Sequence, residues 1–112
     1  MATIEIMCVD QMLVVTEEPI IASGDKNEDE VQFEFDKSWD GYGRVAAFYQ
    51  KKGELYYSIV DQNGKAVIPY ETIKKEGITY IGVIGINGSK VKTTETLKYR
   101  IKEGIIENFE YE

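Results

Sequence analysis

Short apolar runs separated by turn residues recur along this chain, and they constrain its fold more than any other feature. The pattern is clearest at 31–35, where Val31, Phe33 and Phe35 alternate with Gln32 and Glu34. A period of two places three apolar side chains on one face of a strand and the polar ones on the other. About eight such runs follow one another at spacings of roughly 8 to 12 residues, which is typical of a β-sandwich or small barrel. The sequence therefore predicts an all-β antiparallel fold.

The expected strands cover most of the chain, and turn residues such as Asp10-Gln11 and Asn63-Gly64 lie between them. They are 3–9, 12–16, 31–35, 44–50, 54–60, 65–68, 78–86 and 90–101, with a short edge strand at 19–22. One short helix of about two turns is expected at 69–77, where proline suits the first turn and glycine the end. The polar stretch 23–30 is predicted to be an exposed loop. One domain covers 1–112, with 103–112 as a tail or interface segment.

The charge balance limits the partners that this chain can bind. Its 112 residues carry 20 acidic and 13 basic side chains, for a net charge of −7 and a pI of about 4.7. Binding to a nucleic acid backbone or an anionic membrane needs clustered lysine and arginine, so neither partner is expected. No apolar run approaches the ~20 residues that span a bilayer. The start of the chain has no signal-peptide pattern, so synthesis in a reducing cytosol is expected.

Residues that carry catalysis are scarce. The chain has no histidine, which removes the commonest general base and the commonest metal ligand. Its single cysteine, Cys8, falls on one strand face with Ile4 and Ile6, so a small buried hydrophobe is expected there. The 20 acidic residues make some carboxylate pair inevitable, so such a pair carries no information about glycoside hydrolysis. No catalytic residue, cofactor or enzymatic activity is predicted.

The acidic loop resembles a calcium-binding loop only in part. Asp25, Asn27, Asp29 and Asp36 loosely follow the spacing of its oxygen ligands, but Glu30 stands where that loop requires glycine. A solvated acidic loop is the simpler interpretation. No metal site is predicted.

Two groups of residues are candidates for an interface. Trp39 and Tyr42 lie in a glycine-rich loop after a strand, where they could form a docking or sugar-stacking surface. The alternative is that Trp39 caps the core of the sandwich, and this alternative is favoured. The second group comprises Ile105, Ile106, Phe109 and Tyr111, which either pair with another chain or pack back onto the domain.

Several segments in order resemble small tail, baseplate or fibre proteins of phages and prophages of Gram-positive bacteria. They are Ala2-Thr3-Ile4-Glu5-Ile6, Val31-Gln32-Phe33-Glu34-Phe35, Trp39-Asp40-Gly41, Ile68-Pro69, Tyr80-Ile81-Gly82-Val83-Ile84-Gly85 and Thr94-Glu95-Thr96-Leu97-Lys98-Tyr99, with Ile101 and Gly104. The chain is similar over nearly its whole length to the N-terminal domain of upper-baseplate proteins that attach receptor-binding proteins to the tail. The resemblance implies an immunoglobulin-like β-sandwich that self-associates in the virion.

The function expected from this resemblance is structural. The chain would bind other phage structural proteins and copies of itself through strand edges and aromatic surface, after synthesis in the host cytoplasm. The baseplate proteins continue into a coiled coil or fibre, whereas this sequence ends at Glu112, so an adaptor role alone is expected. Two alternatives are a capsid decoration protein and a carbohydrate-binding module that uses Trp39 and Tyr42 as its platform.

Overall fold

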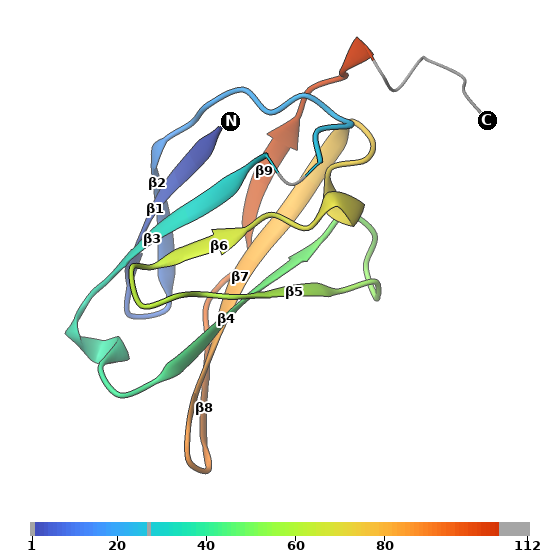
Figure 1. Ribbon diagram of the computed structural model, residues 1–112. Helices are drawn as coiled ribbons and strands as arrows, with labels where there is room; N and C mark the ends of the chain where they lie inside the picture. Colours follow the sequence, from blue (N-terminus) through green and yellow to red (C-terminus); the bar gives the residue numbers. More distant parts are fainter. Residues whose placement is uncertain (1, 27, 106–112) are drawn as a thin grey trace.

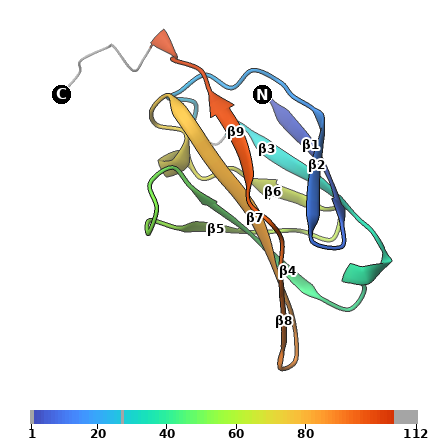
Figure 2. The same ribbon diagram turned by 180° about the vertical axis from the view of Figure 1, so that it is seen from behind.

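A computed structural model describes residues 2–26 and 28–105. This part of the chain forms nine strands in two sheets and two single turns of 3-10 helix (Figures 1 and 2). The strands are β1 (Thr3–Val9), β2 (Met12–Glu17), β3 (Glu30–Phe35), β4 (Gly43–Tyr49), β5 (Tyr56–Ile59), β6 (Lys65–Val67), β7 (Gly77–Asn87), β8 (Lys90–Thr93) and β9 (Leu97–Ile101). The 3-10 turns are η1 (Lys37–Trp39) and η2 (Tyr70–Thr72). The predicted all-β sandwich is confirmed.

The four-stranded sheet has the order β2-β1-β3-β6, and one of its pairings is parallel. Glu17 of β2 lies opposite Glu5, and Glu30 of β3 lies opposite Thr3. β2 therefore ends, and β3 begins, at the same end of β1 but on opposite flanks. Because β2 has already reversed the chain, β3 must run parallel to β1. The sequence predicts antiparallel pairing throughout, which is wrong for β1 and β3; the other pairings between these strands are antiparallel.

The five-stranded sheet is built around β7, the longest strand. β4 pairs along one side of β7, and β5 pairs with the far side of β4. On its other side, β7 pairs with β8 near its end and with β9 near its start. The β7–β8 hairpin projects beyond the rest of the sandwich (Figures 1 and 2).

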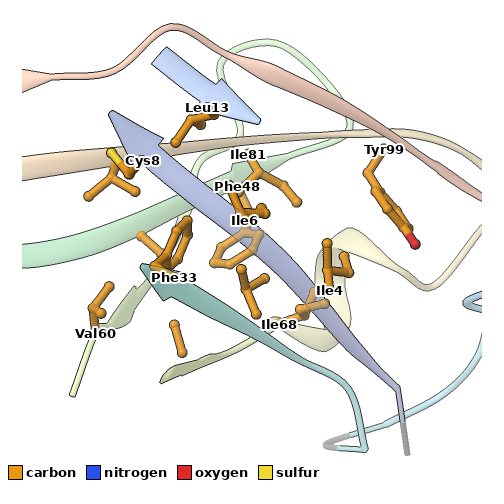
Figure 3. Close-up of a cluster of buried hydrophobic side chains, with 14 of the residues drawn as sticks. Ile4, Ile6, Cys8, Leu13, Phe33, Phe48, Val60, Ile68, Ile81 and Tyr99 are labelled. Atoms are coloured by element: carbon orange, nitrogen blue, oxygen red, sulfur yellow. The ribbon is translucent and has the colours of Figure 1, made fainter. Parts of the chain in front are cut away.

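The core lies between the sheets and follows the alternation in the sequence. Val31 and Phe33 are buried, whereas Glu34, which follows Phe33, is exposed. Figure 3 shows apolar side chains of both sheets in this core, with Phe33 from one sheet and Phe48 and Ile81 from the other. Removal of these side chains from water is the main favourable term for folding.

The predicted last strand, 90–101, is two strands. The backbone leaves β7 at Thr94–Thr96, where the N–H of Glu95 donates at 2.9 Å to the carbonyl of Gln11, in the turn that joins β1 and β2 of the other sheet. The Thr94 hydroxyl takes over one position of the ladder by accepting from the N–H of Val83 at 2.9 Å. A cross-sheet contact therefore divides a segment whose local sequence favours one continuous strand.

The predicted helix at 69–77 is a single turn, η2. Ile73 has no exposed surface, and its carbonyl accepts from the N–H of Gly24 at 3.0 Å. The Thr72 carbonyl accepts from the Thr79 hydroxyl at 2.5 Å. These carbonyls bond outside the helix, so a second turn does not form.

Two predictions for the segment before β3 are wrong. The expected edge strand at 19–22 is reduced to one bridge between Ala22 and Lys102. The expected exposed loop at 23–30 contains Ser23 and Asp29, each 2% exposed, and its last residue starts β3. Asp29 is buried because its Oδ1 accepts from the N–H of Ala2 at 3.0 Å and its carbonyl accepts from Ile68 at 3.0 Å.

The described residues include no helix of the length and apolarity that a membrane span needs.

Candidate interface on the five-stranded sheet

Trp39, the central residue of the predicted aromatic surface, is fully buried. Its indole N–H donates to the carbonyl of Asp10 at 2.7 Å, and its own carbonyl accepts from Arg44 Nη2 at 2.9 Å. The ring centroid lies 5.3 Å from that of Phe35. The prediction that Trp39 caps the core is confirmed, and its assignment as an interface residue is wrong, because a buried ring cannot meet a partner or a sugar.

Tyr42 is half-buried and belongs to the structural cluster around Trp39. The two rings meet edge to face with centroids 6.0 Å apart. Lys92 of β8 places its Nζ 4.7 Å from the Trp39 ring and 5.7 Å from the Tyr42 ring. The same Nζ lies 3.1 Å from Asp10 Oδ1 and 2.8 Å from Ser38 Oγ. These contacts connect the β1–β2 turn, η1 and β8 at one end of the sandwich.

Asp36 belongs to the same group of contacts. We call this group, which consists of Asp10, Asp36, Ser38, Trp39, Tyr42 and Lys92, the end cluster. Its Oδ1 accepts from the Ser38 hydroxyl at 2.5 Å, and its Oδ2 accepts from the N–H of Asp10 at 2.9 Å. The hydrogen bond from the Ser38 hydroxyl is the main reason that the pKa of this carboxyl is lowered. The carboxylate therefore acts as a hydrogen-bond acceptor that orders the turn.

The groups that carry most enzyme chemistry are not gathered in the part of the chain that the structure describes. Cys8 is buried, as predicted, and burial raises the pKa of its thiol to about 11. A protonated thiol is a poor nucleophile and a poor metal ligand. Within residues 2–26 and 28–105, no three His, Cys, Asp or Glu side chains are grouped to hold a metal ion.

The predicted tail interface falls mostly outside the described residues. Ile106, Phe109 and Tyr111 all lie there. Ile105 is described and is 93% exposed. It is the most exposed large apolar side chain of the described residues.

The sequence patterns did not reveal one apolar surface, the side of the five-stranded sheet that faces away from the core. Along β7, Thr79, Ile81 and Val83 are buried, so the even-numbered residues point outward. Their partners in the ladder share this side, because paired residues point to the same face. We call this surface the outer face. It consists of Tyr57 and Ile59; Gly43, Val45, Ala47 and Tyr49; Ile78, Tyr80, Gly82, Ile84 and Ile86; Val91 and Thr93; and Lys98 and Arg100.

The outer face differs in charge from the rest of the chain. Its paired positions include no Asp or Glu, although the chain has 20, and its charged residues are Lys98 and Arg100. The opposite side of the sandwich carries exposed Glu5 and Glu34 on its outward positions. The two broad surfaces of the molecule therefore differ in the charged side chains that their strands carry.

Small residues hollow the middle of the outer face. Ala47 and Gly82 lie opposite each other in the ladder and leave a depression of about 140 Å³. Leu55 and Ile84 line it, and Tyr49 forms one wall by stacking on Tyr80 with ring centroids 4.8 Å apart. A hollow with an aromatic wall can accommodate an apolar anchor side chain of a partner protein.

One sequence signal could have revealed this face. The run 78–86 is apolar at nearly every position, which is typical of a central strand crowded by its neighbours. In the structure β7 is a central strand of its sheet but has a core on one side only. A continuous apolar run in an antiparallel sheet thus marked an uncovered apolar surface.

Comparisons with models of known protein families and with curated proteins find no match to this chain. The resemblance to phage structural proteins therefore stays a prediction.

Proposed function

We propose that this chain is a structural protein of a phage or prophage particle, a tail, baseplate or fibre adaptor, that binds other protein subunits through the outer face. The observation that carries the proposal is an apolar, carboxylate-free sheet surface on a chain with a net charge of −7. Ile59 is 80% exposed, Val91 68% and Tyr57 57%. Apolar side chains gathered on one exposed face are characteristic of protein interaction sites.

The edges of the sandwich favour a face over an edge as the binding surface. Beside β2, the N–H of Leu13 donates to Glu95 Oε2 at 3.1 Å. At the edge strand β6, the carbonyl of Val67 accepts from the Ser58 hydroxyl of β5 at 2.5 Å. These cross-sheet bonds occupy backbone groups that an added strand would need.

The sugar-binding alternative has lost its main support. A stacking platform requires an exposed aromatic ring, and Trp39 has no exposed surface. In the end cluster, the ring of Tyr42 packs edge to face against Trp39, and this contact covers part of the Tyr42 ring. Assembly with other proteins does not depend on the exposure of Trp39 or Tyr42.

Light scattering of the full-length protein over a range of concentrations tests the proposal. We expect the wild type to form oligomers, and Ile59→Glu with Val91→Glu to return the mass to that of one chain. Met12→Glu with Val14→Glu is the matched control, because these side chains are 55% and 46% exposed on the opposite sheet. Equal loss of assembly in both pairs contradicts a specific outer face.

The virion context has its own test in the neighbouring genes. A tail-length or lysis gene beside this one is expected. A location among metabolic genes, or a strictly monomeric protein that binds a glycan on an array, contradicts the structural role.

A further inference from the structure

The end of the sequence combines acidic and apolar residues. Segment 105–112 contains Glu107, Glu110 and Glu112 together with Ile105, Ile106, Phe109 and Tyr111. In an extended chain, side chains alternate with a period of two, so Ile105, Phe109 and Tyr111 would share one side with Glu107, and Glu110 and Glu112 would lie on the other. Such a segment offers a mostly apolar side that carries one carboxylate, with further carboxylates on the opposite side.

The chain is firmly fixed just before this segment begins. The N–H of Lys102 donates to the carbonyl of Ile21 at 2.9 Å, and the N–H of Gly104 donates to Ser23 Oγ at 2.8 Å. Gly104 is buried, and a side chain there would collide with the backbone of Ser23. The next residue, Ile105, is 93% exposed. The side chain of Ile105, the first apolar residue of the segment, therefore does not pack on the domain.

The direction of the chain at this point favours a partner other than its own sheet. Figure 1 shows β9 running to the end of the sandwich that lies opposite the β7–β8 hairpin, and the chain leaving there. Gly104 is not among the glycines with positive φ, so the backbone does not make a glycine-type reversal back over β9. At Ile105 the described chain is therefore at this end of the sandwich, beyond the end of β9.

The outer face complements the segment in charge and in size. Lys98 and Arg100 lie on adjacent outward positions of β9, beside the apolar Ile78 and Tyr80. The opposite sheet carries Glu5 and Glu34 and would repel the same segment. Eight extended residues span roughly 26 Å, enough to cross the roughly 14 Å from β9 to β5.

We propose that segment 105–112 of one copy docks on the outer face of a second copy and joins the copies into an oligomer. This inference rests on the proposed function, since it names the occupant of the same face. Phe109 and Tyr111 supply apolar contact to β7 and β4, and the glutamates pair with Lys98 and Arg100. Reciprocal exchange closes a dimer, and continued exchange in one direction closes a ring.

Two full-length variants with complementary defects test this arrangement by sedimentation velocity. The donor-defective variant carries Phe109→Ser and Tyr111→Ser, and the acceptor-defective variant carries Lys98→Glu and Arg100→Glu. We expect each alone to have the mass of one chain. Their mixture is expected to give a two-chain species, because each supplies the part that the other lacks.

Charge exchange and a matched control sharpen the result. Adding Glu107→Lys and Glu110→Lys to the acceptor-defective variant is expected to restore self-association. Lys51→Glu with Lys52→Glu makes the same charge change at exposed positions in the β4–β5 loop and is expected to leave assembly unchanged.

Three results overturn the inference. Oligomers that survive Phe109→Ser with Tyr111→Ser but dissociate with Ile59→Glu leave the proposed function intact and remove the tail from the interface. A mixture that stays at the mass of one chain shows that the tail does not act between copies. A monomeric wild type whose outer-face amides exchange faster in the donor-defective variant places the tail on its own sheet.

Discussion

The indole ring of Trp39 occupies the space that a side chain at Gly85 would need. A Cβ on Gly85 would lie 2.6 Å from Cζ3 of the indole, closer than carbon atoms approach one another. The two residues lie far apart in the sequence, and their contact fills the end of the core between η1 and β7. The glycine thus makes room for the tryptophan.

Gly85→Ala is therefore expected to destabilise the fold. The added methyl group must displace a ring that is held by its hydrogen bond to Asp10, at a cost of about 1–3 kcal/mol in the free energy of unfolding. Urea unfolding followed by tryptophan fluorescence measures this loss. Gly43→Ala is the control, since a Cβ there meets only an ordinary contact at 3.7 Å, and an equal loss in both variants would contradict the packing argument.

Local patterns in the sequence were sufficient to predict most of the strands. β1 and β3 have the predicted pattern of buried side chains because alternation is a property of neighbouring residues. The β1–β2 turn also follows from its two-residue length, with Asp10 at a φ of 52°. These features need no information from distant parts of the chain.

Features that depend on long-range contacts could not be predicted in this way. Thr94 and Thr96 favour a continuous strand by their residue type, and only the bond from Glu95 to Gln11 shows that the strand is interrupted. Likewise, an aromatic residue in a glycine-rich loop suits a core and an interface equally well. The contact with Gly85 decides this choice for Trp39.

The outer face was missed for a related reason. The sequence shows that both sides of β7 are apolar, but which side is covered depends on where the other sheet packs. Strand order decides this, and strand order is set by contacts between distant segments. The candidate interface therefore needed the structure.

Lys92 is expected to stabilise the fold although it is a lysine near the surface. Only 14% of its side chain is exposed, and its ammonium group bonds to Asp10 and Ser38. Lys92→Ala removes these bonds, and we expect a loss of about 1–3 kcal/mol in urea unfolding. Lys90→Ala, at an exposed position of the same strand, is the control and is expected to change stability little. Equal stability of both variants would show that the end cluster does not hold the strands together.

Asp29 is expected to make stability depend on pH in the mildly acidic range. Burial of the carboxyl, followed by the nearby Asp25 side chain, raises its pKa from 3.8 to about 6. Between these two pKa values the folded protein binds the proton and the unfolded chain releases it. The free energy of unfolding that Asp29 contributes is therefore greatest below about pH 4 and declines as the pH rises through 6.

Asp29→Asn isolates this contribution, because an asparagine keeps the acceptor for the Ala2 N–H but cannot ionise. We expect the stability of the variant relative to the wild type to increase between about pH 4 and pH 7, and urea unfolding at several pH values measures it. Glu28→Gln removes a carboxyl at the neighbouring exposed position and controls for the change in net charge. A stability difference between Asp29→Asn and the wild type that is constant across this range would mean that the buried carboxyl does not titrate there. In that case, a fixed change in packing or hydrogen bonding at position 29, not proton binding, would account for the difference.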